Sequence, residues 1–129
     1  MNTEEEIKKN ILISNVFNEW LLLYQQGKKI TPFFHYNGFR HIAVYGMGNL
    51  GMRLCDEILM SDVVIEYGID KRKMQPYRGI EVLIPNSNLK AVDAIIVSAV
   101  FYYSEIVNEL EKWINCPIIS LEDIIYGSN

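Results

Sequence analysis

Three glycines with the spacing Gly-x-Gly-x-x-Gly stand between two apolar segments, and this spacing is typical of a loop that binds phosphate. They are Gly46, Gly48 and Gly51. In such a loop the first glycine makes a tight turn, the second lets a phosphate approach the backbone, and the third lets helix and strand pack closely. The following helix adds free N–H groups and a dipole that favours an anion. The expected phosphate-binding residues are Gly46, Met47, Gly48, Asn49, Leu50 and Gly51.

An acidic residue follows the next predicted strand, residues 63–69. Asp70 lies about 20 residues beyond the glycines, where an acid can accept hydrogen bonds from a ribose. Lys71 and Arg72 come directly after it, and they can pair with a phosphate of a larger nucleotide or be solvated charges on a turn. Strand alternation predicts that residues 63, 65, 67 and 69 share one face and residues 64, 66, 68 and 70 the other. The alternative is a glycine turn kept only for packing, with Asp70 an ordinary turn residue.

A third group of candidate residues follows the predicted strand 92–98. Ser98 can donate to a phosphate or a sugar, Ala99 comes next, and Phe101 or Tyr102 can stack on a ring. The alternative is that Tyr102 and Tyr103 only cover the edge of the sheet. Both interpretations place this loop beside the glycine turn.

No complete catalytic constellation is visible, so whether the chain is an enzyme stays open. Two Tyr-x-x-x-Lys matches, at residues 24–28 and 67–71, do not lie on one helix as that chemistry requires. His35 precedes the first strand and His41 opens it, at the end away from the glycines. Neither histidine is placed for acid–base catalysis.

The order of predicted elements indicates an α/β fold. Strands are expected at 42–45, 63–69, 80–84, 92–98 and 117–120, with helices at 52–59 and 104–114 and a final helical turn at 121–125. Residues 106, 107, 110, 113 and 114 form the expected buried stripe of the second helix. Such a chain forms an open parallel sheet in the order 3-2-1-4-5 with right-handed crossovers. Ligand is then expected above residues 46–51 and 98–101, where the strand order reverses.

Two helical segments precede the sheet and divide the chain into a packed N-terminal part, 1–40, and the binding domain, 41–129. A helix is expected at about 4–26 with Thr3 and Glu6 as a capping box, and a single turn at 33–36 with Thr31 as its cap and Pro32 at its first position. The aromatic residues near this turn are expected to seat the first helix on the domain.

Composition narrows the function further. The chain has 129 residues, half of them apolar, and a net charge of −4, so it suits one domain with a real core and shows no basic face for nucleic acid. No apolar run is long enough to span a membrane, and no signal peptide is seen. The two cysteines, Cys55 and Cys116, are interpreted as reduced packing residues of a cytoplasmic protein without a metal site.

Taken together, segments 44–51, 67–71, 79–82 and 93–98 resemble the Rossmann-like domain, often called CoA-binding-like, that precedes bacterial nucleotide-sugar dehydratases and epimerases of surface-glycan synthesis. They are also similar to the nucleotide-sugar-binding half of bacterial sugar acetyltransferases. The resemblance covers about residues 41–125. It implies that the loop at Gly46–Gly51 holds a nucleotide diphosphate and that Asp70 lies near the nucleoside. The catalytic halves of those enzymes are not recognised here.

Three functional hypotheses follow. The first is a module that binds NAD or a UDP-sugar and acts as an accessory or regulatory domain in surface-polysaccharide metabolism. The second is part of an NAD-dependent nucleotide-sugar dehydrogenase or epimerase completed by another domain or subunit. The third is a non-catalytic homodimeric interaction module, with its seam formed by the apolar stripe 7–24 together with Trp20, Phe33 and Phe34.

Overall fold

The computed structural model describes residues 2–128 and contains a five-stranded, all-parallel sheet in the order β3-β2-β1-β4-β5. The predicted fold class and strand order are therefore confirmed. The strands are β1 (His41–Tyr45), β2 (Val64–Ile69), β3 (Val82–Leu83), β4 (Ala94–Val97) and β5 (Ile118–Ser120).

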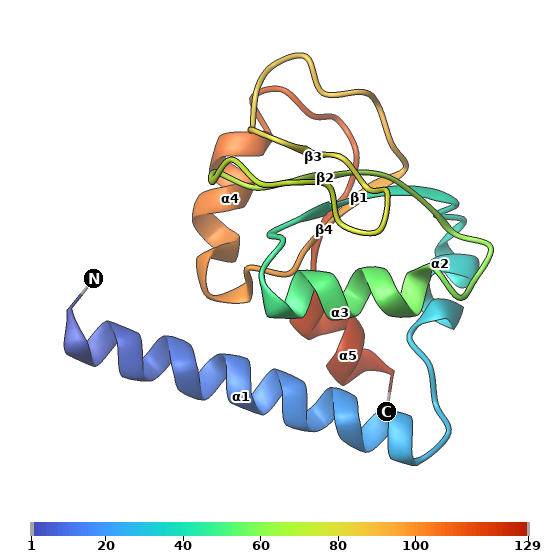
Figure 1. Ribbon diagram of the computed structural model, residues 1–129. Helices are drawn as coiled ribbons and strands as arrows, with labels where there is room; N and C mark the ends of the chain where they lie inside the picture. The colour runs from blue at the N-terminus through green and yellow to red at the C-terminus, as the bar shows by residue number, and fades with distance from the viewer. Residues whose placement is uncertain (1, 129) are drawn as a thin grey trace.

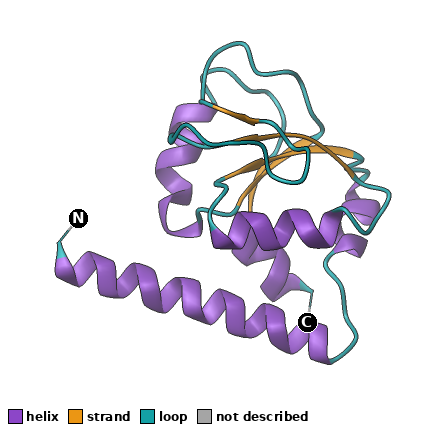
Figure 2. Cartoon of the chain, viewed as in Figure 1, coloured by secondary structure: helices purple, strands orange, loops and turns teal. Residues whose placement is uncertain are grey.

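Helices cover both faces of this sheet (Figures 1 and 2). They are α1 (Thr3–Gln25), α2 (Thr31–Asn37), α3 (Asn49–Ile58), the short 3₁₀ helix η1 (Val100–Tyr102), α4 (Tyr103–Leu110) and α5 (Leu121–Gly127). α3 and α5 pack on one face and α4 on the other, while α1 lies across the outside of α5 and η1. Within residues 2–128, no helix combines the length and the apolar character needed to cross a membrane.

The central strands are buried on both faces because their side chains alternate between two cores. Ile42 and Val44 of β1 join the core beneath α1, α3 and α5. Ala43 and Tyr45 join the core beneath α4. β4 alternates in the same way, which explains its continuous apolar sequence.

A bulge in β2 corrects the predicted alternation of that strand. Ile42 pairs with Ile65, but Ala43 pairs with Tyr67, so Glu66 is the extra residue on the bulged strand. Ile65 consequently packs in the core beneath α3, whereas Tyr67 and Ile69 pack in the core beneath α4. The prediction that residues 63, 65, 67 and 69 share a face is wrong, because an extra residue inverts the alternation.

Both predicted helix caps are wrong by one residue. The N-cap of α1 is Asn2, whose side chain accepts a hydrogen bond from a first-turn amide, and Thr3 is already helical. The N-cap of α2 is Ile30, with Thr31 as the first helical residue and Pro32 in the first turn. Asparagine and threonine are both good caps, so the sequence alone did not separate the two positions at α1.

Two elements are shorter than predicted. β3 excludes Ile80, because that residue forms an antiparallel bridge with Tyr77. α4 ends at Leu110, so Trp113 lies in the following turn and is exposed, where the helical stripe had placed it in the core. Once the helix ends, the helical period no longer predicts which side chains are buried.

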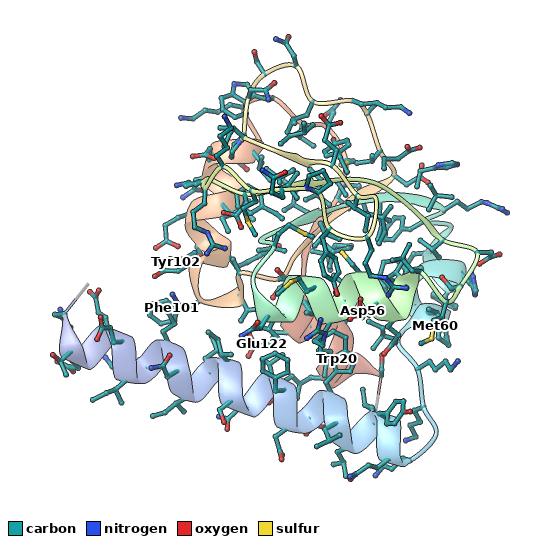
Figure 3. The ribbon with its side chains drawn as sticks, viewed as in Figure 1. Trp20, Asp56, Met60, Phe101, Tyr102 and Glu122 are labelled. Carbon is teal, nitrogen blue, oxygen red and sulfur yellow. The ribbon has the colours of Figure 1, made fainter. Side chains whose placement is uncertain are left out.

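Phe33 and Phe34 of α2 join the same core as the buried residues of α1. Phe34 is fully buried and contacts Phe33 edge-on, with ring centroids 5.4 Å apart. Trp20 is also buried, on the side of α1 that faces the domain (Figure 3), and its Nε1 donates to Glu57 Oε1 at 3.0 Å. Because Trp20 and Phe34 pack within their own chain, their predicted place in a dimer seam is wrong.

We expect Glu57→Ala to lower the free energy of unfolding by about 2–4 kcal/mol, because two donors lose their acceptor. Oε2 of Glu57 accepts from the backbone N–H of Ile30 at 3.0 Å, in addition to the bond from Trp20, so this carboxylate joins α1 and α2 to α3. Urea denaturation measures the change. Glu111→Ala, at an exposed position, is the control and should change stability by no more than about 0.5 kcal/mol. Equal effects of the two variants would contradict this role of Glu57.

Candidate functional site

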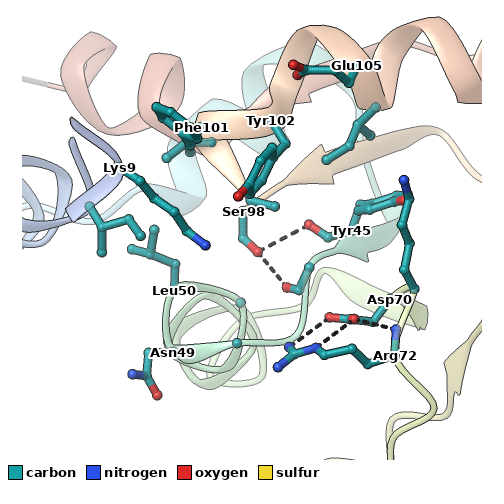
Figure 4. Close-up of a pocket in the computed structure, with 18 of the residues that line it drawn as sticks. Lys9, Tyr45, Asn49, Leu50, Asp70, Arg72, Ser98, Phe101, Tyr102 and Glu105 are labelled. Atoms are coloured by element: carbon teal, nitrogen blue, oxygen red, sulfur yellow. Dashed lines mark hydrogen bonds and ion pairs between the residues drawn. The ribbon is translucent and has the colours of Figure 1, made fainter. Parts of the chain in front are cut away.

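A pocket of about 800 Å³ lies at the carboxyl ends of β1 and β4, where the strand order reverses (Figure 4). The glycine turn, the loop after β2, the loop after β4 and one side of α1 enclose it. Its lining comprises Lys9, Ile13, Phe17, Tyr45, Gly46, Gly48, Asn49, Leu50, Gly51, Asp70, Lys71, Arg72, Ser98, Ala99, Val100, Phe101, Tyr102, Glu105 and Ile106. Every predicted binding residue except Met47 is among them.

The three glycines of the turn differ in what a Cβ atom at each position would contact. Gly46 has a φ of +98°, and a Cβ there would lie 2.7 Å from Ser98 Oγ. A Cβ on Gly51 would lie 1.8 Å from the carbonyl oxygen of Gly46, which no rearrangement of side chains relieves. Gly48 is unstrained, and the nearest atom to its Cβ position is Arg72 Nη2 at 3.9 Å. Packing thus explains the first and third glycines but leaves open space beside the second.

The N-terminus of α3 lies directly after this second glycine. α3 begins at Asn49, three residues earlier than predicted, with Gly48 as N-cap and no side chain among residues 2–128 bonded to the cap. The amide of Met52 donates to the Gly48 carbonyl at 2.9 Å, so residues 49–51 precede the first helical hydrogen bond. These residues line the pocket, which therefore meets the positive end of the helix dipole.

Met47 belongs to the scaffold and not to the pocket. Its amide donates to Asp70 Oδ2 at 2.9 Å, so this N–H is not free to bind a phosphate, as the prediction of Met47 as a phosphate-binding residue requires. Its side chain is buried and covers Gly68 on β2. Met47 thereby fastens the glycine turn to the neighbouring strand.

Asp70 is buried and fully hydrogen-bonded within the chain. Its Oδ1 accepts from the Arg72 amide at 2.9 Å and from Arg72 Nε at 3.1 Å. Its Oδ2 accepts from the Met47 amide and from Arg72 Nη2 at 3.2 Å. A carboxylate offers about four lone-pair positions, and here all are occupied. A ribose hydroxyl can bond to Asp70 only if Arg72 moves away.

Asp70 instead holds the Arg72 guanidinium beside Gly48 (Figure 4). Two of the five N–H groups of that guanidinium are used by Asp70, which leaves three for a ligand. Most of the Arg72 side chain is exposed. The acid therefore orients a cation at the entrance of the α3 N-terminus.

These hydrogen bonds make Asp70 a source of acid-sensitive stability. Burial, the largest influence, raises the pKa of Asp70, but the bonds from Arg72 and Met47 together outweigh it and lower the pKa below its usual value of about 3.9. A lowered folded-state pKa adds stability above about pH 4, and this contribution is lost as the pH falls through the folded pKa. We therefore expect the difference in unfolding free energy between wild type and Asp70→Asn to shrink between pH 5 and pH 2. Urea denaturation across this range measures it, and a difference independent of pH would contradict the assignment.

Lys71 is directed to α4. Its Nζ lies 3.7 Å from Glu109 Oε2, and Oε1 of the same carboxylate accepts a hydrogen bond from the Tyr45 hydroxyl at 3.4 Å. Burial and the charge of Glu109 raise the pKa of Tyr45, so this hydroxyl stays protonated. Lys71 thus lines the pocket with its ammonium group paired to Glu109 of α4.

The loop after β4 forms the opposite wall. The hydroxyl of Ser98 is buried and points to the carbonyl oxygens of Tyr45 and Gly46, so its proton is engaged within the chain. Phe101 and Tyr102 line the pocket with rings 5.3 Å apart in an edge-on arrangement. The Tyr103 hydroxyl instead donates to the carbonyl of Ile118 on the edge strand. Of the two predicted tyrosines, one borders the pocket and the other covers the sheet edge.

Sequence reasoning missed the contribution of α1. Lys9, Ile13 and Phe17 line the pocket, and Lys9 Nζ lies 5.1 Å from the centre of the Tyr102 ring. In Figure 4 Lys9 points from α1 toward the space between Leu50 and Tyr102. Residues 9, 13 and 17 share one face of a helix by their spacing, but that spacing does not show that the face meets the pocket.

Other reactive side chains lie elsewhere. His35 pairs with Asp62 at 2.6 Å and His41 with Glu66 at 3.0 Å, and none of these residues lines the pocket. Cys55 and Cys116 are free cysteines, and burial raises the pKa of Cys55 to about 12. Among residues 2–128 no group of three or more potential ligand side chains is placed to hold a metal ion.

Comparisons with protein-family models, with curated proteins and with solved structures find no match to this chain. The residues of the pocket are therefore the basis for a proposed function.

Proposed function

We propose that this protein is a nucleotide-binding module that holds the diphosphate of a nucleotide sugar at the N-terminus of α3. One observation carries the proposal: Asp70 fixes the Arg72 guanidinium beside Gly48, at a helix end whose cap no side chain occupies. A diphosphate needs backbone N–H donors, a nearby cation and a glycine that admits it to the backbone. The pocket offers all three: the N-terminus of α3 supplies the amides, Arg72 of the loop after β2 supplies the cation, and Gly48 admits the ligand.

A second cation supports a ligand with more than one charged group. Lys9 enters the pocket from α1, on the side opposite the loop that carries Arg72. A diphosphate lying along the α3 N-terminus would meet Arg72 at one phosphate and Lys9 at the other. This arrangement suits an extended polyanion better than a single phosphate, because the two cations come from different walls.

The remaining lining favours a ring or a sugar next to the phosphates. Phe17 and Ile13 of α1 and Phe101 of the loop after β4 form an apolar surface on which a planar base can stack. The pocket volume of about 800 Å³ suits a ligand larger than phosphate.

The occupied Asp70 favours a UDP-sugar over NAD. Dinucleotide sites use the acid after the second strand to accept hydrogen bonds from the ribose. Here Arg72 fills those positions, so an NAD ribose would have to break the bonds between Arg72 and Asp70. We propose the UDP-sugar as ligand, with an accessory or regulatory role in surface-polysaccharide synthesis suggested by the sequence resemblance described above.

Isothermal titration calorimetry with UDP-glucose, UDP, uridine, NAD and inorganic phosphate tests the proposal. We expect UDP-glucose and UDP to bind, uridine to bind at least tenfold more weakly, and NAD to bind more weakly than UDP. Equal binding of uridine and UDP would contradict the role of the diphosphate. No heat from either UDP compound at millimolar concentration would overturn the proposal as a whole.

A further inference from the structure

The outer face of α1 carries large apolar side chains that residues 2–128 leave exposed. Ile7, Ile11 and Leu21 are about half exposed, at 54%, 55% and 55%. On the inner face of the same helix, Val16 and Leu23 are almost completely buried. α1 is thus apolar on two sides, and only one of them is covered by the domain (Figures 1 and 3).

The outer residues recur at the spacing of a coiled-coil seam. Positions 7, 11, 14, 18, 21 and 25 follow one another at alternating steps of four and three residues, and they are Ile7, Ile11, Ser14, Asn18, Leu21 and Gln25. Such a seam packs against another helix by placing each side chain in a gap of its partner. Polar residues in the middle of a seam fix the register at some cost in stability.

Charge is distributed unequally along α1. Three glutamates, residues 4–6, lie in its first turn, where Glu4 pairs with Lys8 at 3.6 Å, and its last turn has no basic residue. Lys28 and Lys29 follow directly after the helix. A parallel pair of these helices would place the three glutamates beside three others. An antiparallel pair would place them beside the lysines of the partner, which is the favourable arrangement.

We propose that a second copy of this chain docks on the outer face of α1, with the two helices antiparallel. In the register that follows from the seam, Ile11 faces Leu21 of the partner subunit and Ser14 faces Asn18 of the partner subunit. The acidic first turn then lies near Lys28 of the partner subunit. The same contacts occur twice, as a two-fold axis requires. α1 is 23 residues long, or about 34 Å, so this seam runs along one side of the domain.

The charges of α1 argue against a lipid surface as the occupant. Helices that lie in a membrane interface carry Lys and Arg beside their apolar face. Here the first turn is acidic, the lysine next to Ile7, Lys8, is paired with Glu4, and the seam residues themselves are neutral. The pocket is not part of the dimer contact, because Lys9 lies on the inner side of α1, so dimerisation and nucleotide binding can be tested separately.

Sedimentation equilibrium on the full chain tests this proposal. We expect a dimer at micromolar concentrations for the wild type and a monomer for Ile11→Glu, with a folded far-ultraviolet circular dichroism spectrum for both. Met60→Glu, at another exposed apolar position, is the matched control and should remain a dimer. A monomeric wild type, or a dimeric Ile11→Glu, would overturn the proposal. Binding of UDP by the Ile11→Glu monomer would leave the proposed function intact.

Cysteine cross-linking separates the two helix directions. We expect the double variant Ser14→Cys with Asn18→Cys to form a disulfide-linked dimer under mild oxidation, while Ser14→Cys alone does not. The wild type, with Cys55 and Cys116, gives the background. Efficient cross-linking of Ser14→Cys alone would indicate parallel helices and would contradict the proposed register.

Discussion

Replacing Gly51 by alanine is expected to lower the free energy of unfolding by about 3–5 kcal/mol, a large part of the stability of a domain of this size. The new Cβ would lie 1.8 Å from the carbonyl oxygen of Gly46. Gly46 has little freedom to move, because its φ is +98° and Ser98 and Ala99 fill the space where its Cβ would be. The start of α3 would have to move away from the sheet. Thermal and urea denaturation measure the loss, which should lower the melting temperature by about 10 °C or more.

Gly48→Ala is the matched control, because the same change at this glycine meets no backbone. The nearest atom to its Cβ position is the end of the Arg72 side chain at 3.9 Å, and its φ of −80° suits alanine. We expect a loss of stability of no more than about 1 kcal/mol, the scale of a helix-cap change. UDP should nevertheless bind about tenfold more weakly, because the methyl group occupies the path of the phosphate to the backbone. Equal stability of the Gly48 and Gly51 variants would contradict this division between ligand access and packing.

Arg72→Ala is expected to weaken UDP binding by about 10- to 100-fold. A hydrogen bond to a charged group contributes about 1.5–3 kcal/mol to the binding free energy, which corresponds to this range of affinity. The variant removes the three N–H groups that point away from Asp70 and also frees the Asp70 carboxylate as a negative charge beside the phosphate. Both effects act in the same direction. Calorimetry with UDP measures the change, and uridine should bind the variant and the wild type equally.

Arg40→Ala is the control for net charge. Arg40 is exposed and precedes β1, at the end of the strand away from the glycine turn. We expect its loss to change UDP affinity by less than twofold at physiological salt, because exposed charges beyond about 8 Å are largely screened. If both arginine variants weaken UDP equally, the effect is a general one of charge and Arg72 has no specific role.

The architecture was predictable because its rules act over short stretches of chain. The apolar residues of β1 and β4 identify central strands that are covered on both faces, and the glycine spacing identifies the turn from strand to helix. With right-handed crossovers these local patterns leave few topologies, and the strand order follows. The bulge at Glu66 was not predictable, because the same sequence reads as a regular strand until its neighbour β1 sets the register.

The pocket was predictable in its location, but the hydrogen bonds among its residues were not. The position of Asp70 after the second strand was correct, yet nothing in the order of residues shows that Arg72 turns back to occupy both of its oxygens. The bond from the Met47 amide depends in the same way on the packing of β1 against β2. Lys9 was missed because it comes from a helix 37 residues before Gly46, and only the fold brings the two together.

The most direct test of the central claim is a nuclear magnetic resonance titration of the ¹⁵N-labelled protein with UDP. We predict that the backbone amide signals of Gly48, Asn49 and Leu50 shift together along one saturating curve. The amide of Gly38, at the end of α2, should not shift, because it already donates to His35 and does not line the pocket. Saturation with shifts elsewhere and none at residues 48–50, or no saturation at millimolar UDP, would contradict a diphosphate site at the N-terminus of α3.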